Sequence, residues 1–130
     1  MILITGSRFM PMYQSEQRQI AKARKRVPDP LVSIHPDTAE SLNLAEGDWA
    51  VISTPKGSIR QKVKITEDMA PNMVDVQHSW WFPEKNEALP ELFGVFESNA
   101  NMLCPDDAEF CSPEIGSWPH SALMCKVEKE

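Results

Sequence analysis

The first chemistry-bearing residues of this sequence come directly after its first apolar segment. The segment "MILIT" is followed by Gly6, Ser7 and Arg8. Thr5 and Ser7 offer hydroxyl groups and backbone amides at the end of a strand, while Gly6 lets the backbone approach a ligand closely. The planar guanidinium of Arg8 suits a phosphate group or the edge of a heterocycle. Taken by themselves, these four residues are better explained as a plain strand-ending turn with a surface arginine.

Further candidates for ligand contact lie at three later points in the chain. A cluster of polar side chains comes first, and its members are Tyr13, Gln14, Ser15 and Arg18. Trp81 belongs to a tryptophan pair, which serves either as core or as a wall for a planar ligand. The amides of Asn99 and Asn101 offer donors and an acceptor that suit the edge of a pterin or purine. An Asx turn explains either asparagine equally well.

Charge is distributed unevenly along the chain, whose formal net charge is −6. Residues 1–28 hold six basic side chains and one acidic one, while residues 29–130 hold seven basic and eighteen acidic ones. A basic segment on an acidic body can steer an anionic ligand toward one face. The overall acidity argues against a nucleic-acid partner, and no apolar run approaches the roughly 20 residues of a membrane-spanning helix. We interpret residues 21–26, "AKARKR", as a solvated helical surface.

Alternating and β-branched apolar residues predict a mainly β domain. In the stretch 58–66, Ile59, Val63 and Ile65 alternate with basic side chains, which indicates one buried and one wet face. The expected strands lie within residues 1–5, 31–34, 49–54, 58–66, 69–82 and 121–128. A small β domain has to protect the edges of its sheet, so we expect a closed barrel.

Helices are predicted to be few and short. The stretch 35–44 has Pro36 near its start and acidic residues in its early turns, where the helix dipole favours them. A second helix is expected over residues 15–26, with Ser15 as its N-cap. From Pro83 onward, prolines interrupt nearly every candidate element. We therefore expect a long, ordered and functional loop region there, with short regular pieces around residues 92–103.

Two other features have both a chemical and a plain interpretation. Gly57-Ser58 matches the type of bond at which pyruvoyl-dependent decarboxylases cleave themselves, but a glycine-containing hairpin turn explains it better. Cys104, Cys111 and Cys125 lack the paired short spacings of zinc sites and are odd in number. We expect free thiols in a reducing compartment, with the cytoplasm favoured. The histidines match neither a catalytic triad nor a metal-ligand spacing.

The motifs, taken in their order, resemble one known domain. They comprise "TGSR" at residues 5–8, "IHPDTA" at 34–39, "EGDW" at 46–49, "HSWWFPE" at 78–84, "NAN" at 99–101 and "CSPEIGSWP" at 111–119. This set resembles the C-terminal molybdopterin-dinucleotide-binding domain of the dimethyl-sulfoxide-reductase family of molybdenum and tungsten oxidoreductases. The resemblance covers residues 2–128. It implies a six-stranded double-psi β-barrel with one or two short helices.

The resemblance also implies which residues contact the cofactor, molybdopterin guanine dinucleotide. The implied contacts are, in chain order, Thr5, Gly6, Ser7, Arg8, Tyr13, Gln14, Ser15, Trp81, Asn101 and Ser121. The first four would face the pterin and the pyrophosphate, and the next three would continue that contact. Trp81 and Asn101 would close over the cofactor from the long loop, and Ser121 would help to complete the pocket. The resemblance implies no catalytic residue and no metal ligand within this chain.

The iron–sulfur cysteines and the metal ligand of this family belong to other domains, which have no counterpart in these 130 residues. We therefore expect residues 1–130 to be one cofactor-binding domain, excised from a larger catalytic subunit, that does not turn over substrate alone. The implied partners are the other domains of that subunit and iron–sulfur electron-transfer subunits. Three alternatives remain. They are a small separate cofactor-site subunit, as in formylmethanofuran dehydrogenase, a pyruvoyl-dependent decarboxylase of the same barrel type, and a double-psi adaptor that binds protein and no cofactor.

Overall fold

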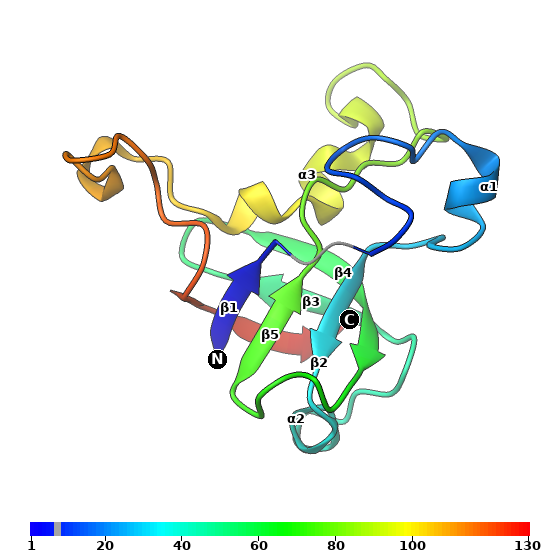
Figure 1. Ribbon diagram of the computed structural model, residues 1–130, viewed down its shortest axis with the longest axis horizontal. Coiled ribbons are helices and arrows are strands. Elements are labelled where there is room, and N and C mark those ends of the chain that lie inside the picture. Colours follow the sequence, from blue (N-terminus) through cyan, green and yellow to red (C-terminus); the bar gives the residue numbers. More distant parts are fainter. Residues whose placement is uncertain (7–8) are drawn as a thin grey trace.

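The computed structural model describes residues 1–6 and 9–130, and most of its regular elements are short strands (Figure 1). The strands are β1 (Ile2–Thr5), β2 (Leu31–Ile34), β3 (Trp49–Ser53), β4 (Ser58–Ile65), β5 (Met73–Val76), β6 (Leu123–Met124) and β7 (Lys126–Lys129). The helices are α1 (Ala21–Arg24), α2 (Pro36–Ser41) and α3 (Val95–Ser98), with short 3-10 helices η1 (Leu92–Gly94), η2 (Ala100–Leu103) and η3 (Ala108–Phe110). The prediction of a mainly β domain with few helices is confirmed.

The strands of the described residues form one curled, mixed sheet in the order β6-β1-β5-β2-β4-β3-β7. Strand β1 pairs in parallel with β5, and β2 with β4, whereas the other neighbours are antiparallel. The two outermost strands, β6 and β7, are consecutive in the chain and are separated only by Cys125. The sheet therefore curls until its two ends meet at one residue. Because the ladder is interrupted at Cys125, the single strand predicted over residues 121–128 is two strands, and the sheet has seven strands instead of six.

The predicted strand that runs into the tryptophan pair is shorter than expected, because β5 ends at Val76. Ser79 has a φ of 56°, a left-handed value that a β-strand does not accommodate. The backbone therefore turns just before the two tryptophans, which differ in burial. Trp80 is fully buried, while Trp81 remains partly exposed.

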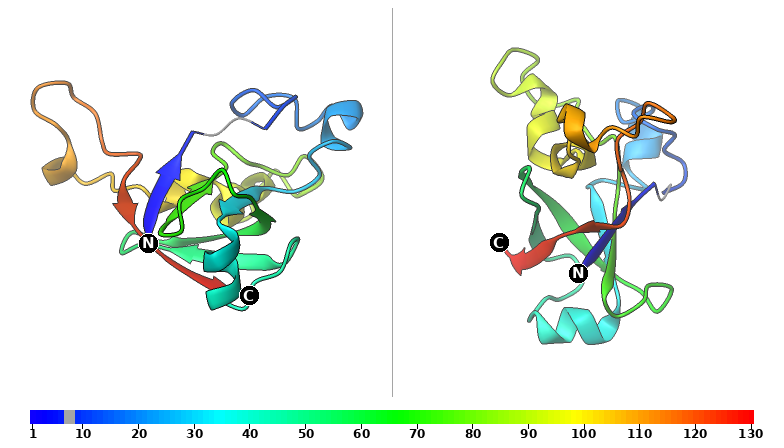
Figure 2. Two further views of the ribbon diagram at one scale, coloured as in Figure 1. Left: turned by 60° about the horizontal axis from the view of Figure 1, so that its bottom comes forward. Right: turned by 90° about the vertical axis from the view of Figure 1, so that its left-hand side faces the viewer.

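The main core lies inside the curled sheet and is closed at one end by α2 (Figure 2). Helix α2 forms as its sequence predicts, with Pro36 in its first turn. The Nδ1 atom of His35 accepts a hydrogen bond from the backbone N–H of Asp37 over 3.1 Å, which satisfies one unpaired amide of the first turn. Ala39 and Leu44 then pack into the core.

One polar side chain crosses this core at a position where alternation predicts an apolar residue. Gln61 of β4 is fully buried, and its Nε2 donates to the backbone oxygens of Gln77 and Ser98 over 2.8 and 2.9 Å. Its Oε1 accepts from the backbone N–H of Gln77 over 3.1 Å. The side chain of Gln77 in turn accepts from Leu31 N–H over 3.0 Å. These bonds offset the cost of burying an amide, and they tie β4 to the end of β5 and to α3.

The helix predicted over residues 15–26 is wrong except for its last turn, α1. Gln14 and Gln17 have φ values of 49° and 72°, and left-handed residues interrupt a right-handed helix. The N-cap of α1 is Ile20, which makes no side-chain capping bond, and not Ser15. Within the described ranges, no helix has the length and apolar character needed to cross a lipid bilayer.

A second, smaller core packs beside α1, and α1 lies at the opposite end of the sheet from α2 (Figures 1 and 2). Its buried members are Met12, Ala23, Val27, Trp80 and Phe82. This cluster joins the chain around α1 to the segment after β5, which is distant in sequence. The predicted loop region beyond Pro83 also packs at this end of the sheet, and it contains the short helices α3 and η1 to η3, as expected.

The hairpin between β3 and β4 gives Gly57 a structural role. Its turn is closed by a 2.9 Å hydrogen bond from Thr54 N–H to the backbone oxygen of Gly57. A Cβ atom on Gly57 would lie 2.8 Å from the backbone oxygen of Met102, which belongs to η2. Close packing of η2 against the hairpin therefore explains the glycine, and no self-cleavage of Gly57-Ser58 is needed to account for it.

We expect Gly57→Ala to lower the free energy of unfolding by about 1–3 kcal/mol, because the added methyl group meets backbone that can move only with η2. Urea denaturation measures this change. The matched control is Ser58→Ala at the exposed neighbouring residue, which should stay within about 0.5 kcal/mol of the unsubstituted chain. Equal stabilities of the two variants would show that η2 does not pack tightly on the hairpin.

Candidate functional site

The structure brings two groups of predicted contact residues together. The indole Nε1 of Trp81 donates a hydrogen bond to the backbone oxygen of Ser15 over 2.6 Å. One residue earlier, the Oε1 of Gln14 lies 3.2 Å from the Nε2 of His78. Residues 13–16 are all exposed. The 13–16 loop and the chain that follows β5 therefore form one continuous outer face.

A buried arginine supports the 13–16 loop from beneath. Arg18 is only 2% exposed, and its Nη1 donates to the backbone oxygens of Gln14 and Glu16 over 2.6 and 3.0 Å. Its Nη2 donates to the backbone oxygen of His78 over 3.4 Å. Burial, together with repulsion from Arg24, lowers the pKa of Arg18 to about 10, so the guanidinium stays charged at neutral pH. Arg18 thus fixes the loop to the chain after β5.

The ring of Trp80 packs against the guanidinium group of Arg18. The guanidinium carbons of Arg18 and Arg24 lie 4.9 and 4.8 Å from the centroid of its ring, within range of cation–π attraction. Phe82 packs edge-on against the same ring, with centroids 6.0 Å apart. Both arginines therefore share one aromatic support, and the position of the loop depends on this buried ring.

The prediction that residues 21–26 form a solvated helical surface is right in part. Lys22, Lys25 and Arg26 are exposed, as expected. Arg24 differs, because it lies over Trp80 and its Nη2 pairs with Glu84 Oε1 at 2.8 Å. The helix thus contributes one arginine to the second core and presents its other cations to solvent.

A separate group of predicted contacts lies at the end of β1. The Oγ1 of Thr5 donates to the backbone oxygen of His120 over 2.6 Å, and the Oγ of Ser121 donates to the backbone oxygen of Thr5 over 3.5 Å. Gly6 has a φ of 121°, with no atom within 4 Å of the place a Cβ would occupy, so its conformation and not a lack of space requires glycine. The predicted contacts that lie outside the described residues are Ser7 and Arg8.

Asn101 belongs to η2 and is exposed. Its backbone N–H donates to the Oδ1 of Asn99 over 3.1 Å, so the Asx turn considered for Asn99 is present. Within the described part of the chain, no hydrogen bond joins the Asn101 side chain to Thr5 or to the 13–16 loop. Its role as a contact residue stays a prediction.

The three cysteines are free thiols, as predicted. Burial raises the pKa of the Cys104 and Cys125 thiols, so both are protonated at neutral pH. In the parts of the chain described here, no three histidine, cysteine, aspartate or glutamate side chains are grouped to hold a metal ion.

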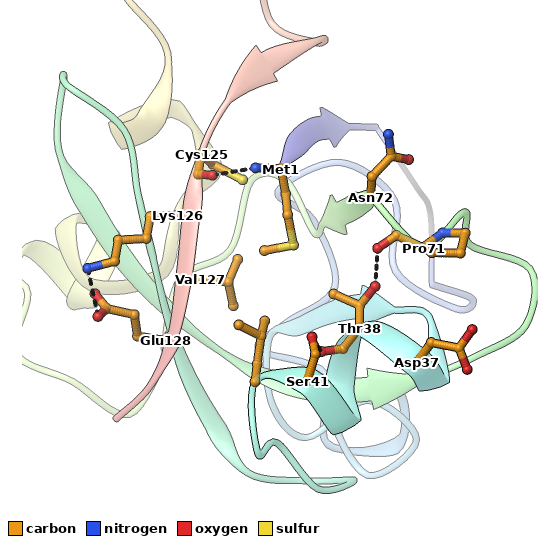
Figure 3. A pocket seen from close by; sticks show the side chains of 11 residues that line it. Met1, Asp37, Thr38, Ser41, Pro71, Asn72, Cys125, Lys126, Val127 and Glu128 are labelled. Atoms are coloured by element: carbon orange, nitrogen blue, oxygen red, sulfur yellow. Dashed lines mark hydrogen bonds and ion pairs between the residues drawn. The ribbon is translucent and has the colours of Figure 1, made fainter.

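The predicted contact residues that the structure describes are all exposed or partly exposed. A pocket of about 700 Å³ lies at the other end of the sheet, between α2, Met1 and β7 (Figure 3). None of the described contact residues lines it. A smaller apolar pocket of about 340 Å³ is lined in part by Pro119, Leu123 and Met124. These residues lie within three positions of Ser121 in the sequence.

One family model matches most of the chain. The family is described as "Molydopterin dinucleotide binding domain", and the match covers residues 1–114. The chain belongs to this family. The molybdopterin-dinucleotide-binding domain is 34% identical over 125 residues to the dopamine dehydroxylase of Eggerthella lenta, a match that covers 96% of this chain and 12% of that protein. It is 32% identical over 118 residues to the acetylene hydratase of Syntrophotalea acetylenica, which corresponds to 89% of this chain and 16% of that protein.

A solved structure of acetylene hydratase from Pelobacter acetylenicus has the same fold. It superimposes on the molybdopterin-dinucleotide-binding domain with a TM-score of 0.90 at 30% identity, over 98% of this chain and 18% of that chain. The domain thus spans less than a fifth of the length of each of these relatives. The sequence-based prediction of a molybdopterin-dinucleotide-binding domain, of the kind found in molybdenum and tungsten oxidoreductases, is confirmed, and so is the cofactor class.

The chemistry of the exposed face fits a flat, anionic cofactor. Tyr13 and Gln14 carry polar side chains on the exposed 13–16 loop, and the indole of Trp81 is bonded to the same loop. The charge of Arg18 lies directly beneath. Its Nε atom is buried without a hydrogen-bond partner among the described residues. This face of the molybdopterin-dinucleotide-binding domain therefore combines polar side chains, an aromatic ring and one buried positive charge.

Sequence reasoning missed the residues that support this face. From the sequence, Arg18 is one of several polar residues in a cluster, and His78 is the first residue of the motif at 78–84. The one available signal for Arg18 is its place in a polar cluster directly before a short apolar stripe. Nothing in the sequence pairs His78 with Gln14, which lies 64 residues away.

Proposed function

We propose that this chain closes one side of a molybdopterin guanine dinucleotide as a domain of a larger molybdenum or tungsten oxidoreductase subunit. In this proposal residues 1–130 form a single domain with the double-psi arrangement of barrel strands. The bond from Trp81 Nε1 to the backbone oxygen of Ser15 is the observation that carries the proposal. It unites two sets of predicted contacts that are 66 residues apart in the sequence.

The bound cofactor carries the molybdenum or tungsten ion at which the reaction occurs. The chain itself binds and shields the organic part. The ring of Trp81 offers an apolar wall to the flat pterin, while Tyr13, Gln14 and Ser15 offer hydrogen bonds at its edge. Arg18 keeps these groups in place and adds a positive charge that favours an anionic ligand.

The end of β1 serves the phosphate groups in this proposal. Backbone amides at Gly6 and Ser7 and the guanidinium of Arg8 suit the pyrophosphate. Hydrogen bonds already join Thr5 to the backbone of His120 and Ser121 to the backbone of Thr5. This part of the face is therefore ordered before any ligand binds. Asn101 is proposed to approach the same cofactor from η2.

The partners in this proposal are the other domains of the catalytic subunit, which supply the metal ligand and the opposite wall of the site. Iron–sulfur subunits would deliver or remove electrons in parent enzymes that transfer them. The chain by itself is proposed to bind the cofactor without turning over substrate. The long relatives that it matches over less than a fifth of their length support this division of roles.

Titration of the 130-residue chain with a stable, oxidised molybdopterin guanine dinucleotide tests the proposal. Backbone amide signals should shift at the residues Thr5, Gly6, Tyr13, Gln14, Ser15, Trp81, Asn101 and Ser121. Gln14→Ala should weaken binding about fivefold, because one hydrogen bond contributes about 1 kcal/mol. Nuclear magnetic resonance follows both effects.

The matched control is Gln19→Ala, which removes an exposed amide of the same segment outside the proposed face. It should leave the affinity unchanged. Equal weakening by both substitutions would contradict the role of Gln14. Shifts concentrated at Asp37, Thr38 and Ser41, which line the pocket in Figure 3, would place the cofactor at the wrong end of the sheet for this proposal.

A further inference from the structure

Three consecutive residues in η1 have left-handed backbone conformations. Leu92, Phe93 and Gly94 have φ values of 41°, 55° and 67°. Glycine adopts such values freely, but leucine and phenylalanine do so at a cost. Strained residues of this kind persist only where the surrounding structure enforces them, and they concentrate at functional sites.

The surrounding structure enforces this turn through the base of a closed loop. Phe82 N–H donates to the backbone oxygen of Phe93 over 2.7 Å, and Phe93 N–H donates to the backbone oxygen of Asn86 over 2.8 Å. Gly94 packs directly on the neighbouring chain, since a Cβ there would lie 2.7 Å from Cδ2 of Phe82 and 2.9 Å from Cδ of Lys85. Residues 82–94 thus form a loop whose two ends are fastened together.

The strained turn presents one aromatic ring to the proposed cofactor face. The ring of Phe93 packs edge-on against the ring of Trp81, with centroids 5.5 Å apart and an interplanar angle of 71°. The same indole donates to the backbone oxygen of Ser15 over 2.6 Å. Trp81 is therefore held on two sides, by Phe93 at its ring and by Ser15 at its N–H group.

We propose that Phe93 is a positioning residue that fixes the indole of Trp81 before the cofactor binds. This inference rests on the proposed function, in which Trp81 forms the wall for the pterin. Phe93 does not contact the cofactor in this account; it acts through Trp81. A tryptophan side chain that is already ordered binds the cofactor more tightly than one that must be ordered on binding. The reason is that the loss of conformational entropy has already occurred during folding.

Phe93→Leu tests the proposal, because leucine keeps an apolar side chain and the same backbone strain but removes the ring. The first readout is solvent exchange of the Trp81 indole N–H, assigned with a Trp81→Phe variant, and it needs no cofactor. We expect exchange to become roughly three- to tenfold faster, as the worth of one aromatic pair implies. The dinucleotide affinity should fall by a similar factor, and Phe93→Tyr should restore both values.

The matched control is Phe96→Leu, a half-exposed phenylalanine in the neighbouring helix α3. It should leave indole exchange and affinity unchanged. Unchanged indole exchange in Phe93→Leu would overturn the proposal, and so would faster exchange with unaltered affinity. If the unsubstituted chain binds the dinucleotide elsewhere, the proposed function fails, while indole exchange still decides whether Phe93 positions Trp81.

Discussion

Replacing Trp80 with alanine is expected to lower the free energy of unfolding by about 3–5 kcal/mol. The ring is fully buried, Phe82 packs against its edge, and both Arg18 and Arg24 lie over it. Its removal leaves a cavity in the second core and deprives two guanidinium groups of their aromatic support. Since domains of this size have total stabilities of about 5–15 kcal/mol, this is a large part of the whole. Chemical denaturation followed by circular dichroism measures it.

Trp118→Ala is the matched control for this loss. The Trp118 side chain is 36% exposed, and its Nε1 donates to the backbone oxygen of Asp107 over 2.9 Å. Its truncation should cost only about 1 kcal/mol, the typical contribution of one hydrogen bond and a partly exposed ring. Similar losses in the two variants would show that Trp80 is not the centre of the second core.

Arg18→Met is expected to disorder the 13–16 loop and to weaken dinucleotide binding by roughly tenfold or more. The substitution removes the hydrogen bonds to the backbone oxygens of Gln14, Glu16 and His78. Hydrogen bonds from a charged group contribute about 1.5–3 kcal/mol each, and binding falls in proportion to the fraction of molecules with an ordered loop. Amide hydrogen exchange measures the order of the loop, and titration calorimetry measures the affinity.

The effect of Arg18→Met on overall stability should be smaller, about 2 kcal/mol. The lowered pKa of Arg18, about 10, reflects the cost of burying its charge, and methionine carries no such cost. The control is Arg24→Met, which removes the other cation over Trp80 but leaves every bond from Arg18 to the loop. If loop exchange and affinity respond equally to both substitutions, the carbonyl bonds of Arg18 do not order the loop.

The parts of the fold that follow from local chemistry were predictable. Alternation in β4 and the proline at the start of α2 each reflect a preference of neighbouring residues, and both elements occur where expected. The prediction of a helix over residues 15–26 was wrong because a contact with a residue distant in sequence determines the conformation of this segment. Arg18 packs on Trp80, which lies 62 positions later in the sequence. Gln14 and Gln17 have left-handed backbone conformations, which a right-handed helix does not accommodate.

The segments that contribute to the candidate site could be predicted from the sequence, but their contacts with one another could not. The sequence indicated residues 13–15 and Trp81 separately, and the bond between Ser15 and Trp81 joins them. The supporting residues could not be found in the same way. A buried arginine has no sequence pattern that distinguishes it from an exposed one, and the left-handed conformation of Phe93 is indicated only by the glycine that follows it.

The junction of β6 and β7 at Cys125 also determines when this domain can complete its sheet during synthesis. Strands β1 and β3 each have one neighbour that the ribosome makes only after residue 122. At roughly 5–20 residues per second, several seconds pass between the translation of β5 and that of β7. During this time β1 and β3 are edge strands of the nascent sheet, each unpaired on one side. We expect chaperone contact with the nascent domain to persist through this interval, and a chain that ends before Leu123 to aggregate.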